Sequence, residues 1–325
     1  MKKLLGLALA FVIGCSSYNS DYKLENASKV VQATGQIASL TGSKKSLEET
    51  LFEDAEDGKL DMDFEKAVFI ASGCKDFMVD FYRKEVNIFL KEIIDSVENK
   101  TDKLERAKLI AKKIREKTKY KLFEYRFHYL ANKGIRQGNC LGLTILFNLA
   151  CERDGIKSGF QNTLTHSFPY AEVDGKRTYL DLTTDTLLPD KSDLEDELIY
   201  EPSKLDIVAQ LYCIKAAGLS REGKMEEAKA IYKKGLKVCP RNSHILENLV
   251  KINEGLNDEE AARNMDLYIK EYPELPQLYV YKTRILLRLE KYKDAVSCLK
   301  KSLEIKKDSE VENWIKRTSE EHLKK

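Results

Sequence analysis

Three side chains in the sequence have the types needed for nucleophilic chemistry: Cys140, His166 and Asp181. A cysteine thiolate attacks carbonyl carbons, an imidazole removes and returns protons, and a carboxylate holds the imidazole in the required orientation. Together they would support acyl transfer through a covalent thioester. The residues are far apart in the sequence, so the surrounding elements must bring them together.

Cys140 is expected in the first turn of a helix. Asn139 is a favourable N-cap residue, a mostly apolar run follows it, and Gly155 is a typical helix stop. In the first turn the thiol lies beside unpaired backbone N–H groups at the positive end of the helix dipole. Both effects favour a thiolate and a neighbouring anion.

His166 and Asp181 are expected on neighbouring antiparallel strands. Two strand-like runs are joined by Asp174-Gly175, a strong signal for a two-residue hairpin turn. That turn places position 183 opposite His166. Asp181 then lies diagonal to His166 on the same face, within reach of a hydrogen bond to the imidazole.

The segment before this site, residues 47–130, is predicted to be helical. Apolar residues recur at spacings of three and four, as in Phe64, Ala67, Val68 and Ala71. With the hairpin, these helices predict an α+β fold, in which leading helices pack with a core that contains a small antiparallel sheet.

The C-terminal third contains an internal repeat. Small residues recur at Ala228, Ala261 and Ala295, with spacings of 33 and 34. This pattern resembles the tetratricopeptide repeat, whose units are helix–turn–helix pairs with a period of 34 residues. We expect three repeats over 205–307 and a capping helix over 308–325. Such an array either packs on its neighbour domain or offers a concave face to a protein or peptide partner.

The central segment resembles the transglutaminase-like superfamily, papain-related enzymes with a Cys-His-Asp triad in that chain order. The resemblance rests on Arg136-Gln-Gly-Asn-Cys140 opening an apolar helix, on Gly155-Ile156 ending it, on His166 in a strand and on Tyr179-Leu-Asp181 in the next. It covers about 46–190. It is strongest to the bacterial branch in which this domain precedes tetratricopeptide repeats.

The resemblance implies a role for each site residue. Cys140 would be the nucleophile, His166 the general base and acid, and Asp181 the residue that orients the imidazole. The Cys140 backbone N–H would stabilise the oxyanion together with one side chain, for which Gln137 is the candidate. The chain departs from the family in having Ser167-Phe168 where an aromatic residue usually follows the histidine.

The N-terminus resembles a bacterial lipoprotein signal. Two lysines precede the apolar run 4–13, which is too short to cross a membrane, and Cys15 follows almost at once. The resemblance implies a signal peptide at 1–14, export, and lipidation of Cys15 as an anchor at the periplasmic or cell-surface face. The alternative is an ordinary signal with an incidental cysteine. Residues 15–45 are predicted to form a flexible tether.

Composition and motifs limit the other classes of function. Lys plus Arg total 55 against 53 Asp plus Glu, and no long basic run is present, so nucleic-acid binding is not expected. The sequence has no Gly-rich phosphate loop, zinc-protease motif or calcium loop, so neither a cofactor nor a metal is expected. The remaining cysteines are expected to be buried and free.

Two functions are therefore open. The first is a membrane-anchored cysteine enzyme, a protease, amidase or acyl transferase, that acts on carboxamide or peptide bonds while its repeats recruit a protein partner. The second is a catalytically inactive lipoprotein scaffold or assembly factor that uses both domains for protein binding.

Overall fold

The computed structural model describes residues 45–122, 124–162, 166–184, 187–188 and 201–322. The chain divides into two compact units, Met1–Glu49 and Thr50–Lys325, and the candidate site belongs to the second. The predicted signal peptide, Cys15 and nearly all of the predicted tether lie outside the described residues. Among the described residues, no helix is long and apolar enough to span a membrane.

The first half is built from helices, as predicted. They are α3 (Leu47–Asp54), α4 (Phe64–Ala71), the 3-10 turn η1 (Asp76–Met78), α5 (Val79–Asp95), α6 (Lys103–Lys117) and α7 (His128–Ala131). Acidic N-caps begin two of them, because Asp63 accepts a hydrogen bond from the Lys66 backbone N–H and Asp102 accepts one from that of Glu105.

The predicted helix over residues 118–127 was wrong. Thr118 is extended, and the short strand β1 (Lys119–Tyr120) follows. The Lys119 N–H donates to the Arg136 carbonyl at 2.7 Å, so β1 pairs in parallel with β2 (Gln137–Gly138). A backbone N–H that donates to a distant segment cannot also form the i to i−4 hydrogen bond of a helix. The spacing of apolar residues does not reveal such a distant partner.

An antiparallel sheet has the strand order β3 (Lys157–Asn162), β4 (Ser167–Val173), β5 (Lys176–Leu180) and β6 (Leu187–Leu188). The predicted hairpin register between β4 and β5 is confirmed, since Val173 pairs with Lys176. Asp174 and Gly175 have φ values of 51° and 75°, the left-handed pair of a two-residue turn. The described part of the chain is mostly helical with small sheets, consistent with an α+β fold.

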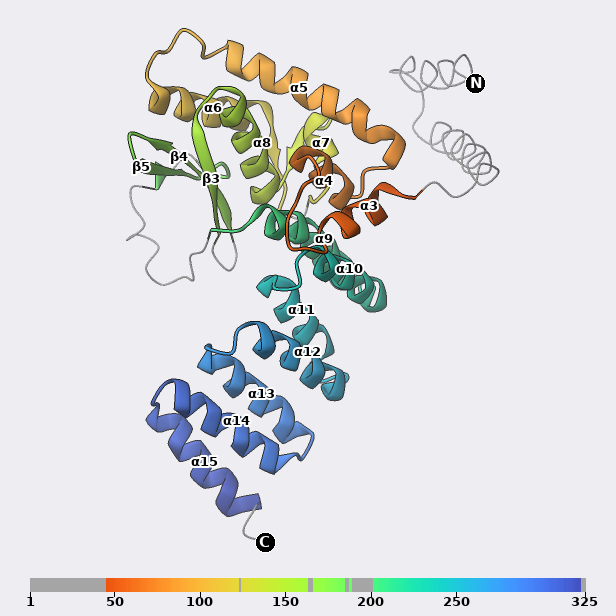
Figure 1. Cartoon of the computed structure of the whole chain (residues 1–325), viewed down its shortest axis with the longest axis vertical. Helices are drawn as coiled ribbons and strands as arrows, with labels where there is room; N and C mark the ends of the chain where they lie inside the picture. Colours follow the sequence, from red (N-terminus) through yellow and green to blue (C-terminus); the bar gives the residue numbers. More distant parts are fainter. Residues whose placement is uncertain (1–44, 123, 163–165, 185–186, 189–200, 323–325) are drawn as a thin grey trace, which may run out of the picture. The chain divides into compact units, whose positions relative to one another are not determined.

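Helix α8 (Cys140–Arg153) lies at the centre of this assembly. It packs against β3, β4, α5 and α6 (Figure 1). Every residue from Leu141 to Cys151 is buried, so the helix has no solvent-facing stripe along this stretch. Its N-terminal end, with Cys140, is therefore held in place from several sides.

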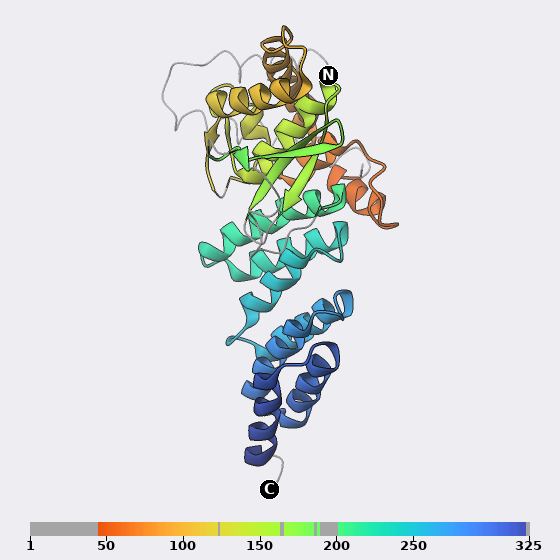
Figure 2. The same cartoon turned by 90° about the vertical axis from the view of Figure 1, so that its left-hand side faces the viewer.

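The C-terminal region is a helical array, as predicted. It contains α9 (Lys204–Arg221), α10 (Met225–Val238), α11 (Ser243–Asn253), α12 (Asp258–Glu271), α13 (Pro276–Arg288), α14 (Tyr292–Ile305) and α15 (Ser309–His322). The first six form three successive pairs, and α15 packs on α14 (Figure 2). Ala228, Ala261 and Ala295 are all fully buried, which explains why a small residue recurs where paired helices approach closely.

Helix α9 belongs to the array and also packs against the preceding region. Its buried Gln210 side chain accepts a hydrogen bond from Asn162 Nδ2 at 3.0 Å, at the end of β3. Its Tyr212 ring lies 6.3 Å from the ring of Phe52. The first repeat helix therefore packs against α3 and α4 and is bonded to the end of β3.

Two helical glycines allow a matched test of this packing. A Cβ on Gly235 would overlap the Ile245 side chain and lie 3.1 Å from Tyr212 Cβ, whereas one on Gly218 would meet nothing within 4 Å. We expect Gly235→Ala to lower the free energy of unfolding by roughly 1–3 kcal/mol through overpacking. Gly218→Ala should raise it by up to about 1 kcal/mol, because alanine restricts the unfolded chain. Urea denaturation of the two variants measures both effects, and equal effects would contradict the close packing of α10 on α9 and α11.

Candidate active site

The turn before α8 fixes the position of Cys140. Asn139 is the predicted N-cap, and its Oδ1 accepts a hydrogen bond from the Gly142 N–H at 2.8 Å. The cap is almost fully buried, while Cys140 is partly exposed and carries a free thiol. The predicted location of the thiol in the first helical turn is confirmed.

The residues just before Asn139 are attached to two earlier helices. A Cβ on Gly138 would lie 2.8 Å from Leu130 of α7, so only glycine lets β2 approach this helix so closely. The Arg136 guanidinium lies 4.1 Å from the centre of the Phe89 ring in α5. These contacts fix Arg136 and Gly138, and with them the backbone that leads into Asn139 and Cys140.

Polar side chains on one face of α8 connect the helix to the sheet. Thr144, one turn after Cys140, donates from Oγ1 to the Ser167 carbonyl at 3.2 Å. Asn148, one turn further, donates from Nδ2 to the Gly159 carbonyl at 3.2 Å. Residues four apart share a helix face, so this face aligns Cys140 with the start of β4 and hence with His166.

His166 and Asp181 lie close together, as predicted, but the prediction that both are on paired strands was wrong. β4 begins at Ser167 and β5 ends at Leu180, and their pairing reaches only Tyr170 with Tyr179. Nε2 of His166 lies 3.4 Å from Oδ1 of Asp181. The same Oδ1 accepts hydrogen bonds from the Thr183 N–H at 2.8 Å and from Thr183 Oγ1 at 2.7 Å. Asp181 lies beyond the end of β5, where pairing with β4 no longer fixes the backbone. The two hydrogen bonds from Thr183 hold its carboxylate in position instead.

The electrostatics of the site unite the three residues. Burial by itself lowers the pKa of His166, but hydrogen bonds to Asp181 and Cys140, with the charges of both, outweigh it and raise the pKa to about 10. Burial raises the pKa of Asp181, but hydrogen bonds from His166 and Thr183 outweigh it and hold that pKa below its ordinary value. The arrangement favours the protonated form of the imidazole.

The other described cysteines and His128 have different surroundings. Burial raises the pKa of every other described cysteine, and it does so to about 12 for Cys74, Cys213 and Cys239. Burial, followed by the charge of Arg126, lowers the pKa of His128 to about 4 and keeps that ring neutral. These groups resemble ordinary core residues.

Two further sequence features can be placed. Phe168, which the resemblance marked as a departure, is buried with its ring 5.4 Å from the His166 ring. It supplies the aromatic neighbour of the imidazole from two positions downstream. Gln137, the candidate oxyanion donor, lies half-buried in β2, three residues before Cys140.

Sequence reasoning missed three residues that the structure brings to the site. Thr144 could have been found from its spacing of four from Cys140, and Thr183 from the Asp-x-Thr pattern of a local side-chain turn. Tyr120 had no such signal. The charges of Cys140 and Asp181 contribute, after burial, to a raised pKa of its phenol, so it lies near both.

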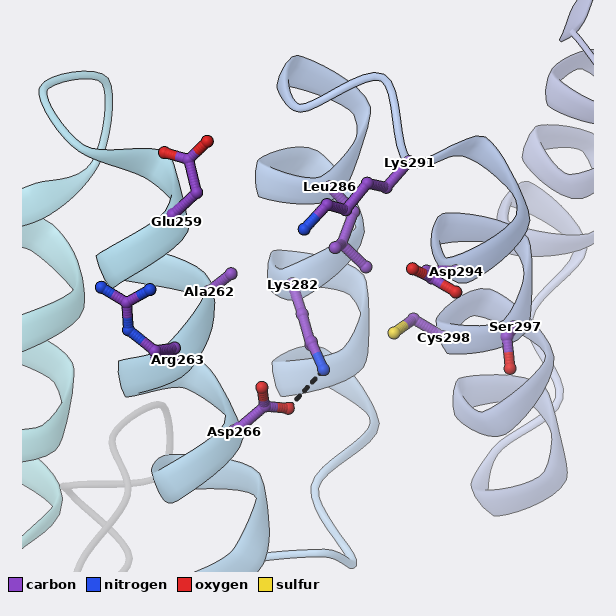
Figure 3. A pocket seen from close by; sticks show the side chains of 10 residues that line it. All are labelled: Glu259, Ala262, Arg263, Asp266, Lys282, Leu286, Lys291, Asp294, Ser297 and Cys298. Atoms are coloured by element: carbon purple, nitrogen blue, oxygen red, sulfur yellow. Dashed lines mark hydrogen bonds and ion pairs between the residues drawn. The ribbon is translucent and has the colours of Figure 1, made fainter.

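A pocket of about 390 Å³ lies away from these residues, in the helical array. Figure 3 shows side chains from α12, α13 and the start of α14 around it, with Lys282 paired to Asp266. Its charged lining is balanced in sign: Arg263, Lys282 and Lys291 against Glu259, Asp266 and Asp294. In the described part of the chain, no group of three or more histidine, cysteine or carboxylate side chains could hold a metal ion.

Comparison with known families supports the repeat prediction. The sequence model of the tetratricopeptide repeat matches residues 209–242 and 278–309, which contain most of the first and third helix pairs. Such repeats generally mediate protein–protein interaction, and that role is indicated for this array. A comparison with curated proteins finds no match.

The ionisation of His166 can be measured directly. In a pH titration followed by NMR of the ring carbons, we expect a midpoint near 10 for His166. Cys140→Ser or Asp181→Asn should move this midpoint down toward the ordinary value of about 6.5, because each removes an anion that stabilises the imidazolium. His128 serves as the internal control and should titrate near 4 in all three proteins. A wild-type midpoint near 6.5 for His166 would contradict the ion pairing.

Proposed function

We propose that the protein is a cysteine-dependent acyl-transfer enzyme of transglutaminase-like type, acting on a carboxamide or peptide bond. One observation carries the proposal: His166 lies 3.4 Å from Asp181 on one side, and its pKa is raised to about 10 by that carboxylate and by Cys140. A thiol, an imidazole and a carboxylate in this order form the chain of groups that nucleophilic acyl transfer requires. Core packing alone does not call for such a chain.

The first half-reaction forms a thioester. The Cys140 thiolate attacks the carbonyl carbon, a C–S bond forms, and the carbonyl π electrons move to oxygen. The imidazolium of His166 then donates its proton to the amide nitrogen as the C–N bond breaks and the amine leaves. Asp181 keeps the ring in the correct orientation and stabilises its positive charge.

The second half-reaction releases the acyl group. Neutral His166 takes a proton from water or an amine, whose oxygen or nitrogen attacks the thioester carbonyl. Collapse of the tetrahedral intermediate breaks the C–S bond and restores the thiolate–imidazolium pair. Hydrolysis, deamidation and cross-linking share these steps and differ only in donor and acceptor.

The helical array supplies the second part of the proposal. Tetratricopeptide repeats present helix faces to protein segments, so the array would recruit the protein that carries the acyl donor or acceptor. The pocket shown in Figure 3 supports this role, since its mixed charges suit a polar peptide. It also favours the second candidate function, an inactive scaffold that binds partners without turnover.

Membrane anchoring is the third part of the proposal. It rests on Cys15, which follows the apolar run 4–13 in the arrangement of a lipoprotein signal. Acyl chains on this cysteine, at about 0.8 kcal/mol per buried CH₂, would hold the protein at the periplasmic or cell-surface face without a membrane-spanning helix.

Thiol labelling separates the enzyme from the scaffold. At neutral pH we expect iodoacetamide to modify Cys140 faster than any other cysteine of the folded chain, with the modified residue identified by peptide mapping. His166→Ala should slow labelling of Cys140 by roughly tenfold or more, because the thiolate loses its imidazolium partner. Asp181→Asn should slow labelling less, since the imidazole remains.

His322→Ala is the matched control, because this histidine is exposed in α15. It should leave the labelling rate unchanged. The scaffold function is favoured if Cys140 reacts no faster than the buried Cys74, or if the His166 variant labels like the wild type.

Detergent phase partition tests the anchor. The wild-type protein, expressed in a bacterium that processes lipoproteins, should enter the detergent phase. Cys15→Ala should either accumulate as the uncleaved precursor or move to the aqueous phase, because the acceptor thiol for the lipid is missing. Normal cleavage with unchanged partition would leave Cys15 as an incidental residue after an ordinary signal.

A further inference from the structure

We propose that the Tyr120 hydroxyl is the side-chain donor that stabilises the oxyanion formed when Cys140 attacks a carbonyl. The inference rests on the proposed acyl-transfer function and identifies a catalytic residue that the sequence did not indicate. Together with the Cys140 backbone N–H, Tyr120 would complete a pair of donors around the developing negative charge.

Strand pairing places Tyr120 beside the nucleophile. Tyr120 of β1 pairs with Gly138 of β2, and the next residue, Lys121, donates its N–H to the Gly138 carbonyl at 2.9 Å. Gly138 is followed by the helix cap Asn139 and then by Cys140. The tyrosine is therefore attached through the backbone to the segment that carries the thiol.

The same pairing separates Tyr120 from Gln137. Cross-strand partners share a face of a ladder and successive residues alternate, so Tyr120 is on the face of Gly138 while Gln137 is on the other. The two side chains therefore leave this ladder on opposite faces. The phenol lies close enough to Cys140 and Asp181 for their charges to act on it, which favours Tyr120 as the donor.

The phenol is in the state that donation requires. Burial, followed by the charges of Cys140 and Asp181, raises the pKa of Tyr120 above its ordinary value. The hydroxyl therefore keeps its proton at neutral pH and can donate a hydrogen bond. Tyr120 is also 45% exposed, which leaves room for a substrate carbonyl beside it.

The donor acts in one defined step. As the C–S bond forms, the carbonyl π pair becomes a lone pair on oxygen, and the Tyr120 O–H donates a hydrogen bond to it without losing its proton. When the lone pair returns to re-form C=O, the bond to the leaving group breaks and the thioester remains. Tyr120 therefore affects acylation but not alkylation of the thiol, because displacement on iodoacetamide forms no oxyanion.

Two probes on the full chain in detergent test this distinction. 4-Nitrophenyl acetate acylates a thiolate through an oxyanion and releases nitrophenolate, whereas iodoacetamide alkylates the thiolate directly. We expect Tyr120→Phe to slow acetylation of Cys140 by about 10- to 100-fold. This is less than the roughly 100- to 1,000-fold typical for loss of one oxyanion donor, because the phenol is partly exposed. The alkylation rate should remain within about twofold of wild type. Tyr279→Phe is the matched control, because it removes a phenol hydroxyl that donates to the Pro273 carbonyl in the helical array. It should change neither rate by more than about twofold. Gln137→Leu tests the other candidate donor.

Four other results would overturn the inference, and each has a different pattern of rates. Unchanged acetylation in Tyr120→Phe excludes the donor role, and a loss confined to Gln137→Leu transfers that role to the amide. Equal loss of acetylation and alkylation in Tyr120→Phe would mean that the phenol acts on the thiol itself. If wild type is acetylated no faster than Cys140→Ser, the proposed function fails together with the inference that rests on it.

Discussion

Helix α8 is buried on every side from Leu141 to Cys151, and the rest of the central region is arranged around it. Full burial of a leucine, isoleucine or phenylalanine side chain contributes roughly 1.5–3 kcal/mol, so any rotation or sliding of this helix would be costly. Cys140 is the first residue of the helix and inherits this rigidity. The hydrogen bonds from Thr144 and Asn148 to backbone carbonyls of β4 and β3 then set the direction in which the rigid helix faces the sheet.

A second constraint is the charge of the partly buried imidazolium. An isolated buried cation would lose its proton, because burial lowers the pKa of His166. Hydrogen bonds to Asp181 and Cys140, together with the charges of both groups, reverse that outcome and raise the pKa of His166. Thr183 contributes indirectly, because its two hydrogen bonds hold Asp181 ionised and in position. The site therefore depends on residues from α8, from the position just before β4 and from the segment after β5.

The helical array and the central region meet at α9. Asn162, which is bonded to Gln210 of α9, lies four positions before His166 at the end of β3. The helix that opens the array is thus fixed to the strand that leads toward the site. Removal of the array at the start of α9 would take away a packing partner of the core as well as a protein-binding surface.

A structural feature could be predicted from the sequence when the interaction that forms it joins residues close together in the chain. The cap at Asn139, the Asp174-Gly175 turn, the register of β4 with β5 and the repeat spacing of Ala228, Ala261 and Ala295 all follow from neighbouring residues, and the structure agrees with each. These features require only helix capping, turn conformation and side-chain periodicity.

Tertiary structure alone decided the remaining features. The strand at Tyr120 forms because its backbone pairs with residues 137–138, across a loop and α7. The bond from Thr144 to Ser167 and the docking of α9 on Asn162 also join segments that are distant in sequence. Local propensity carries no information about such partners, because a backbone or side-chain donor takes whichever acceptor the packed chain places beside it. The sequence therefore indicated which groups could react, and packing decided which other groups surround them.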